Sequence, residues 1–269
     1  SNDERLKIGF DLYDLSSDFS LWALKNCDYL FKRNLNEEHI ELLKREYQGC
    51  KIMSFTWNFG CKTVKSFSLK IILGFVLFQL KDNTKINRYF FRNIKKNILY
   101  SVGHIRQVAK RRSIEYFRQI PEEVDTVSNR ILFQSRCFSD LDLNSRHIQD
   151  FRSKVIQLLK LNFPKDFVGG FIPDPTSIKL YPNLVTRQNT SPIDYLNLLK
   201  SSDIVIYTEG LNHSPAWKFA EYASQGKVIV AQRFQFSMPF DIVDGEDVIF
   251  FDTPKELFDI ITKLKNSEK

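Results

Sequence analysis

The sequence predicts an α/β protein with parallel sheets, because strand and helix signals alternate along both ends of the chain. Short, β-rich apolar runs are separated by stretches with helical periodicity and helix-capping residues, a pattern typical of βαβ units. A length of 269 residues is long for one domain and comfortable for two. Hydrophobic residues make up 43% and charged residues 26% of the chain, a composition typical of a soluble globular protein.

The N-terminal part of the chain is expected to alternate between strands and helices. Strands are expected at 6–12, 29–32 and 51–57, and helices at 17–26 and 36–47. The second helix has the clearest start, because Asn36 is a good N-cap and Glu37 and Glu38 place negative charge in the first turn.

The composition changes from basic to acidic at residues 120–123, which predicts a domain boundary there and domains of residues 1–124 and 125–269. Beyond it, strands are expected at 130–135, 167–172, 203–208, 227–231 and 247–251, and helices at 145–160, 191–200, 214–225 and 254–264. This is the pattern of a doubly wound α/β sheet, in which ligands bind beyond the carboxyl ends of the strands.

The four cysteines, Cys27, Cys50, Cys61 and Cys137, show neither a CxxC pair nor the spacing of a metal site with histidine. We expect free thiols that are buried or partly buried, and neither a metal nor a cofactor. Because the sequence shows no secretory signal at its start, a reducing cytoplasm is the expected compartment.

The positive charge of the chain is concentrated in residues 62–118, which carry fourteen Lys and Arg against Asp82 and Glu115. Within this segment, residues 67–80 are strongly apolar but too short to span a bilayer. The segment could lie on an anionic membrane surface, bind nucleic acid, or form a solvated basic face of packed helices. Because no recognised RNA- or DNA-binding motif is present, we expect no nucleic acid among the partners and keep peripheral membrane contact through 62–118 open.

The helix expected at 214–225 has both of its ends marked in the sequence. Ser214 is a good N-cap, Pro215 suits the first helical position, and Gly226 suits the position after the last turn. The helix follows directly on the strand expected at 203–208, so its start should project over the carboxyl edge of the sheet. Unpaired amides and a partial positive charge at a helix N-terminus favour an anion at that place.

One face of this helix is expected to be a polar stripe of Ser214, Lys218, Glu221 and Gln225. Lys218 is placed to add positive charge to a bound diphosphate. Glu221, one turn further along, is placed to accept hydrogen bonds from the two hydroxyls of a ribose. The alternative is that Lys218 and Glu221 form an ordinary solvated pair on the helix surface.

The segment 202–231, SSDIVIYTEGLNHSPAWKFAEYASQGKVIVA, resembles the signature of GT-B glycosyltransferases of the group-1 (GT4-like) type. In that family a strand beginning SDI is followed by EG, by a helix with the wording LEAMASGKPVIA, and by a DG loop, here Asp244 and Gly245. The resemblance implies two Rossmann-like domains that face a cleft, a small N-terminal acceptor-side domain and a C-terminal domain that binds a nucleotide sugar. It also implies that Glu221 binds the donor ribose.

Two further positions are compared with this family. Arg136 follows the strand expected at 130–135, as does the family's arginine that reaches the diphosphate; a plain surface arginine is the alternative. His213 stands where the family often has a second glutamate, so the paired-glutamate spacing associated with a retaining mechanism is not met. We expect His213 and Ser214 to meet the sugar or the phosphates, and a loop histidine without a role is the alternative.

The resemblance implies a metal-independent glycosyltransferase that moves a hexose from a UDP- or GDP-sugar to a glycan or lipid-linked acceptor. Such a role fits bacterial surface polysaccharide synthesis at the inner face of the membrane. The alternative is a non-catalytic nucleotide-sugar-binding or partner subunit. Asp11 and Asp14 follow the first strand and are candidates for an acceptor-side base, but an aspartate in a turn is more often structural, so the catalytic residue stays unassigned.

Overall fold

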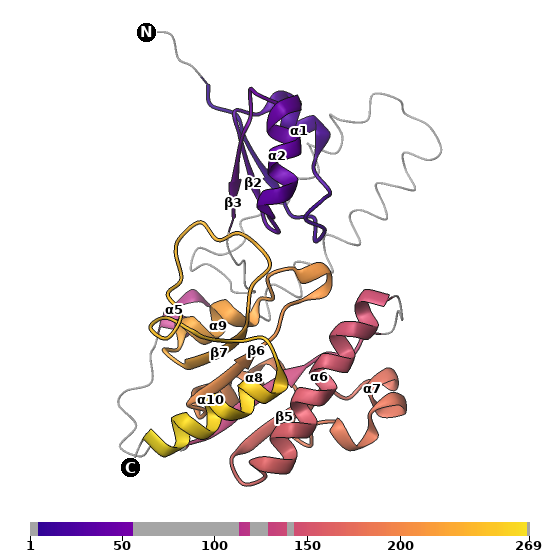
Figure 1. The fold of residues 1–269 in the computed structure, drawn as a ribbon, viewed down its shortest axis with the longest axis vertical. Helices are drawn as coiled ribbons and strands as arrows, with labels where there is room; N and C mark the ends of the chain where they lie inside the picture. The colour runs from indigo at the N-terminus through magenta and orange to yellow at the C-terminus, as the bar shows by residue number, and fades with distance from the viewer. Residues whose placement is uncertain (1–4, 56–112, 119–128, 139–142, 268–269) are drawn as a thin grey trace. The chain divides into compact units, whose positions relative to one another are not determined.

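The computed structural model describes residues 5–55, 113–118, 129–138 and 143–267 (Figure 1). The chain divides into one unit formed by Ser1–Asn58 and Pro121–Lys269 and a second unit, Phe59–Ile120. Of the second unit, the structure describes residues 113–118, which contain the short helix α5 (Ile114–Arg118). The fold described below is therefore that of the first unit.

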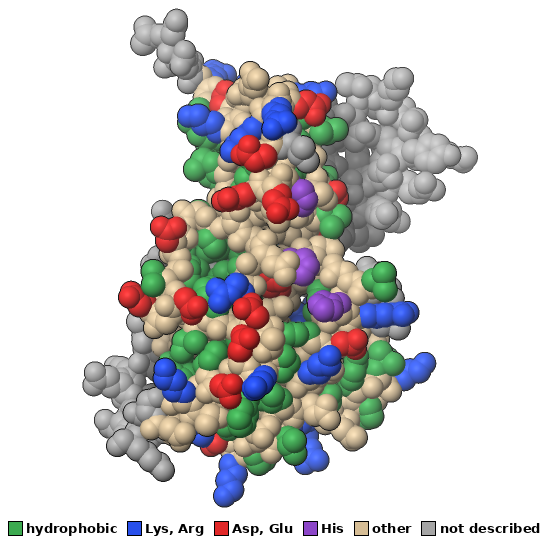
Figure 2. Space-filling model, viewed as in Figure 1, with side chains coloured by type: hydrophobic (Ala, Val, Ile, Leu, Met, Phe, Trp, Pro, Cys, Tyr) green, Lys and Arg blue, Asp and Glu red, His purple; other side chains and the backbone are tan. Residues whose placement is uncertain are grey.

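Several expectations fall on residues outside this description. They are the apolar segment 67–80, most of the basic segment 62–118, Cys61, and the boundary predicted at 120–123. Within the described residues, no helix is long and apolar enough to cross a membrane. On the face that Figure 2 shows, acidic and basic side chains of the described residues are interspersed.

The N-terminal sheet consists of parallel strands in the order β1-β2-β3, namely β1 (Ile8–Asp11), β2 (Tyr29–Lys32) and β3 (Lys51–Ser54). Helices α1 (Leu21–Asn26) and α2 (Glu37–Glu46) connect them. Ser20 caps α1, and Asn36 caps α2 by accepting a hydrogen bond from the amide of Glu38, which confirms the predicted start of that helix. A small core contains Ala23, Leu24, Cys27, Leu30 and Cys50.

The C-terminal sheet has five parallel strands in the order β5-β4-β6-β7-β8. They are β4 (Ile131–Ser135), β5 (Phe167–Phe171), β6 (Ile204–Tyr207), β7 (Val228–Gln232) and β8 (Ile249–Phe251). From β4 the chain moves to β5 on one side, and it then returns to the other side of β4 with β6. The direction of winding therefore reverses between β4 and β6. The predicted α/β class with parallel sheets is confirmed.

The strands of this sheet are connected by helices of very different length. The described helices are α6 (Leu143–Asn162), α7 (Pro175–Leu180), α8 (Pro192–Lys200), α9 (Lys218–Ser224) and α10 (Pro254–Ser267), with 3-10 turns η1 (Pro182–Leu184) and η2 (Leu211–His213). Val155, Ile156 and Leu159 of α6 share one core cluster with Leu257 and Ile261 of α10. The same cluster includes residues of β4, β5, β6, β7 and β8, so these two helices pack on the sheet.

Some sequence-based expectations are corrected here and others are confirmed. The helix expected at 214–225 begins at Lys218, four residues later than predicted, whereas Gly226 follows its end with a φ of 59°, as a glycine in that position should. Helix α7 was not predicted. Cys27, Cys50 and Cys137 are buried free thiols, as predicted.

Candidate functional site

The reversal of winding between β4 and β6 defines where a ligand is expected. In open parallel α/β sheets the connections leave neighbouring strands in opposite directions at this point, which opens a crevice beyond their carboxyl ends. The segments that follow these two strands begin with Arg136 after β4 and with Thr208 and Glu209 after β6. Most of the site residues predicted from the sequence lie in or just beyond these segments.

The segment 210–217, between β6 and α9, contains the 3-10 turn η2 and does not form the first turn of α9. The amide of Gly210 donates to the carbonyl of Ser214 at 2.9 Å, and the amide of Ser214 donates to the carbonyl of Leu211 at 3.0 Å. Gly210 is needed here, because a Cβ at this position would lie 2.7 Å from Ser214 Oγ. Ser214 is buried within the turn.

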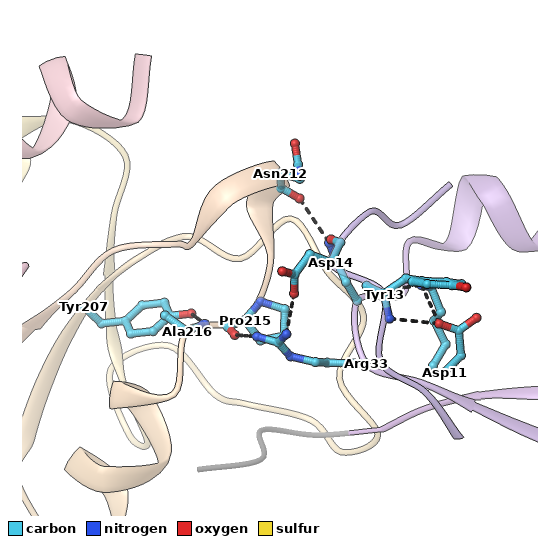
Figure 3. Close-up of polar contacts among 10 residues, drawn as sticks. Asp11, Tyr13, Asp14, Arg33, Tyr207, Asn212, Pro215 and Ala216 are labelled. Carbon is cyan, nitrogen blue, oxygen red and sulfur yellow. Dashed lines mark hydrogen bonds and ion pairs between the residues drawn. The ribbon is translucent and has the colours of Figure 1, made fainter. Parts of the chain in front are cut away.

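The prediction that Ser214 caps a helix is therefore wrong, and its physical reason is a competing hydrogen bond. The amide of Ala216 is one that a cap at Ser214 would accept, but it donates to the hydroxyl of Tyr207 at 2.9 Å (Figure 3). α9 has seven residues, and among the described residues no side chain caps its start. The anion site expected at a helix N-terminus at Ser214 is thus not formed.

Lys218, the first residue of α9, points toward the end of β4. Its ammonium group donates to the backbone carbonyl of Gln134 and lies 4.8 Å from the centre of the Tyr195 ring. Burial lowers the pKa of Lys218 to about 7; Glu221 acts to raise it, and Arg152 and Arg136 lower it further. Lys218 is therefore a half-buried amine at the winding reversal that is only partly protonated at neutral pH.

Glu221 lies one turn further along α9 and belongs to the same cluster. It is half-buried, and its charge is felt by Lys218 and by the hydroxyls of Tyr195 and Tyr222. Burial raises the pKa of both tyrosines, and Glu221 adds to the effect. The alternative that Lys218 and Glu221 form a solvated surface pair does not describe this arrangement, because the lysine is directed inward.

Arg136 follows β4 directly and is exposed, at the predicted position. Beneath it lies Arg152 of α6, which is 5% exposed and which the sequence interpretation missed. Arg152 donates from Nε to Thr208 Oγ1 at 3.1 Å and from Nη2 to the carbonyl of Glu209 at 2.7 Å. Its Nη1 donates to the carbonyl of Arg136 at 3.3 Å. One guanidinium thus joins the segments after β4 and β6.

The charges around the end of β4 favour an anion. Burial lowers the pKa of Arg152 to about 10, so it stays protonated at neutral pH. Arg136 and Arg152 both lie close enough to act on Lys218, and Glu221 is the acidic group that acts on it. Two guanidinium groups and a partly protonated Lys218, set against Glu221, favour a positive potential at the end of β4.

His213 and Glu209 form a second polar pair in this region. His213 Nδ1 lies 2.8 Å from Glu209 Oε2; the glutamate side chain is 3% exposed and the histidine side chain 43%. Burial raises the pKa of Glu209, while its hydrogen bonds with His213 and with the amide of Gln235 oppose that shift. Asn212 and His213 both have φ of 55°, a left-handed conformation that is uncommon outside glycine.

The 210–217 segment is also contacted by two residues that follow β2 (Figure 3). Arg33 Nη2 donates to the carbonyl of Pro215 at 3.0 Å, and Arg33 forms an ion pair with Asp14. Asn34 Nδ2 donates to the carbonyl of Asn212 at 3.1 Å. Neither Arg33 nor Asn34 was singled out from the sequence, and their position directly after β2 is the signal that points to them.

Asp11 is not available as the acceptor-side base for which it was a candidate. Its Oδ1 accepts hydrogen bonds from Lys32 Nζ at 3.3 Å and from the amide of Tyr13 at 3.0 Å, and its Oδ2 accepts one from the amide of Ser20 at 2.9 Å. Lys32 and Asp11 are 0% and 1% exposed as side chains. Asp14 is exposed and engaged by Arg33. The structural interpretation of Asp11 therefore holds.

Comparison with known proteins adds no family assignment. No family model matches the sequence, and no curated protein matches it at a significant level. Among the described residues, no group of three or more His, Cys, Asp or Glu side chains is arranged to hold a metal ion. The functional argument rests on the geometry and charge of the site.

Proposed function

We propose that the protein is a glycosyltransferase that moves a sugar from a UDP- or GDP-sugar to a glycan or lipid-linked acceptor. The observation that carries the proposal is the cluster of Arg136, Lys218 and Glu221 at the winding reversal between β4 and β6. The crevice at this point is the usual binding place for nucleotides in parallel α/β sheets. The cluster offers both a positive potential and a hydrogen-bond acceptor there.

Arg136 and Lys218 suit the diphosphate of the donor. When the sugar is transferred, negative charge develops on the departing diphosphate, and fixed cations at that place stabilise it. Arg136 is exposed and has a planar fork of donors for phosphate oxygens. Arg152 has a different task, because its guanidinium is already bound to Thr208 and to backbone carbonyls. It holds the two segments that would carry the donor.

Glu221 suits the ribose of the donor. A carboxylate accepts from both ribose hydroxyls at once, and its place one turn beyond Lys218 separates the two parts of the nucleotide that they would bind. In this proposal the β1–β3 sheet belongs to the acceptor-side domain of a GT-B-like enzyme, and the β4–β8 sheet belongs to the donor-side domain.

Nucleotide binding by Glu221 is tested with UDP, GDP and CDP in a thermal-shift screen, since a ligand that binds the folded state raises the apparent stability. For the best nucleotide, Glu221→Ala should weaken binding by about 1–3 kcal/mol, the range for a lost charge-assisted hydrogen bond. Asp259→Ala, an exposed carboxylate on α10, is the matched control and should bind as the unmodified protein does. Unchanged affinity in a folded Glu221→Ala protein would contradict the proposal.

A non-catalytic nucleotide-sugar-binding or partner subunit is the second candidate. The observation that favours it is the closed environment of Asp11, which removes one candidate base from the acceptor side. Turnover separates the two candidates. A pure protein that binds a nucleotide sugar but neither transfers the sugar to any acceptor nor hydrolyses the donor is a binding subunit.

A further inference from the structure

Glu209 is held at each of its polar atoms. Its Oε1 accepts from the amide of Gln235 at 2.7 Å, and its backbone carbonyl accepts from Arg152 Nη2 at 2.7 Å. Its amide donates to the side chain of Gln232 at 3.4 Å. Its Oε2 faces His213 Nδ1, so the carboxylate lies between the amide of Gln235 and the histidine ring, while β7 and α6 hold the backbone of Glu209. Because this buried carboxylate is held in place, its hydrogen bond to Nδ1 orients the ring of His213.

The backbone around His213 is held in an unfavourable conformation. A left-handed φ is uncommon outside glycine, and two consecutive residues keep it where surrounding contacts hold them. Those contacts are present, because Asn144 Nδ2 donates to Asn212 Oδ1 at 2.6 Å and Asn34 Nδ2 donates to the carbonyl of Asn212. These contacts hold Asn212, the residue directly before His213, and so help to fix where the turn places the histidine.

The pairing with Glu209 also selects the tautomer of His213. An ionised carboxylate only accepts hydrogen bonds, so Nδ1 carries the proton and Nε2 of the neutral ring carries a lone pair. With Nδ1 engaged, Nε2 is the nitrogen left for a substrate, and the ring is partly exposed. A buried carboxylate behind an accessible imidazole is the arrangement of an oriented general base.

We infer that His213 is the general base of the transfer reaction and that Glu209 positions it; this inference rests on the function proposed above. Arg152 bonds to the carbonyls of both Glu209 and Arg136, so it joins the segment that carries the base to the segment that carries Arg136. His213 Nε2 takes the proton of the attacking hydroxyl as its oxygen bonds to the anomeric carbon. The bond from that carbon to the phosphate oxygen breaks, and its electron pair leaves with the nucleoside diphosphate.

The base is tested by turnover and binding measured on the same variants. The substrates are UDP-glucose and GDP-mannose, with water as the attacking hydroxyl, and the readout is release of UDP or GDP. His213→Gln should lower kcat by roughly 100- to 10,000-fold, the range for loss of a general base, while UDP or GDP affinity changes less than about twofold. His147→Gln, an exposed histidine on α6, is the matched control and should retain full turnover.

The positioning role of Glu209 has its own readout. In Glu209→Gln the amide nitrogen would donate to Nδ1 and place the proton of His213 on Nε2, where it blocks proton acceptance. Nitrogen-15 NMR of the His213 ring should show the Nδ1–H form in the unmodified protein and the Nε2–H form in Glu209→Gln, together with loss of turnover. An unchanged tautomer with full turnover in that variant would overturn the positioning role.

The outcomes separate this inference from the function on which it rests. If the unmodified protein hydrolyses a donor and His213→Gln does so equally well, the base assignment is wrong while the proposed function stands. If the unmodified protein neither binds nor turns over any nucleotide sugar, the proposed function is wrong and the base assignment falls with it. Loss of turnover in His213→Gln with nucleotide binding kept supports both.

Discussion

At the carboxyl edge of the N-terminal sheet Asp11 pairs with Lys32, and at the carboxyl edge of the C-terminal sheet Glu209 pairs with His213. Both pairs join a buried carboxylate to a nitrogen group on a segment next to it. In the first pair both side chains are fully buried. In the second, the carboxylate is buried and the imidazole is partly exposed. A pair without access to a substrate stabilises the fold, whereas a pair with one accessible member is available for chemistry.

The surroundings of the two pairs differ in the same way: Lys32 is enclosed by other groups, whereas His213 is partly open to solvent. Lys32 Nζ also donates to the carbonyl of Tyr13 at 3.2 Å and lies 5.1 Å from the ring of Phe19, so its charge is enclosed on several sides. His213, by contrast, is partly exposed and lies in a turn in which both Asn212 and His213 have a left-handed φ. Strained backbone tends to occur where a side chain must be presented to a ligand.

The largest effect on stability is expected when the buried Asp11–Lys32 ion pair is broken. Asp11→Ala leaves the Lys32 charge buried without its carboxylate and should lower the free energy of unfolding by about 3–5 kcal/mol. Asp11→Leu combined with Lys32→Met removes both charges and should recover much of the loss. Urea unfolding measures both. A cost below about 1 kcal/mol for Asp11→Ala would show that the pair is not structural and would return Asp11 to the candidates for a base.

Lys218→Met should have the opposite effect: the variant should be more stable than the unmodified protein near pH 7, and it should bind the nucleotide clearly less well. Burial holds the pKa of Lys218 near 7 in the folded protein, below its ordinary value of 10.5. The unfolded chain therefore binds more protons between these two values, and the unmodified protein gains stability as pH rises through that window. Lys218→Met should not show this gain, so the stability advantage of the variant should shrink between pH 7 and 10.

The same variant should weaken binding of UDP or GDP at pH 6.5 by about tenfold or more, because a charge-assisted contact to the diphosphate contributes about 1.5–3 kcal/mol. Affinity of the unmodified protein should fall as pH rises above 7, since Lys218 then loses the proton that attracts the phosphates. Titration calorimetry at several pH values measures both effects. Lys154→Met, an exposed lysine on α6, is the control. A pH-independent affinity that survives Lys218→Met would remove Lys218 from the site.

Most strands and helices were predictable because local signals and the fold agree. Ser191 was expected to start the helix at 191–200, and its side chain does accept a hydrogen bond from the amide of Asp194. The start of α9 was mispredicted although Ser214 and Pro215 carry equally good local signals. The hydroxyl of Tyr207 takes the amide of Ala216, and no local pattern reveals that contact. Local propensity was overridden there by tertiary structure.

The candidate site was predictable in part for the same reason. Lys218, Glu221 and Arg136 lie where their positions after strands placed them, at one end of one sheet. Arg152 carried a signal in the sequence, because it falls among the apolar positions of the amphipathic helix α6, between Ile148 and Val155. A charged residue on a buried helix face needs partners, so such a position predicts a role in holding neighbouring segments.

The smallest effect on stability is expected at Arg33, which follows β2 and contacts the segment after β6. Arg33→Ala removes one hydrogen bond to the carbonyl of Pro215 and the ion pair with exposed Asp14, and should cost about 1 kcal/mol in urea unfolding. Arg33→Lys should restore little, because a single ammonium does not reproduce a planar fork that reaches both partners. Arg45→Ala, an exposed arginine on α2, is the control. If Arg33→Ala changes neither stability nor turnover, the hydroxyl of Tyr207 is sufficient to hold the segment that presents His213.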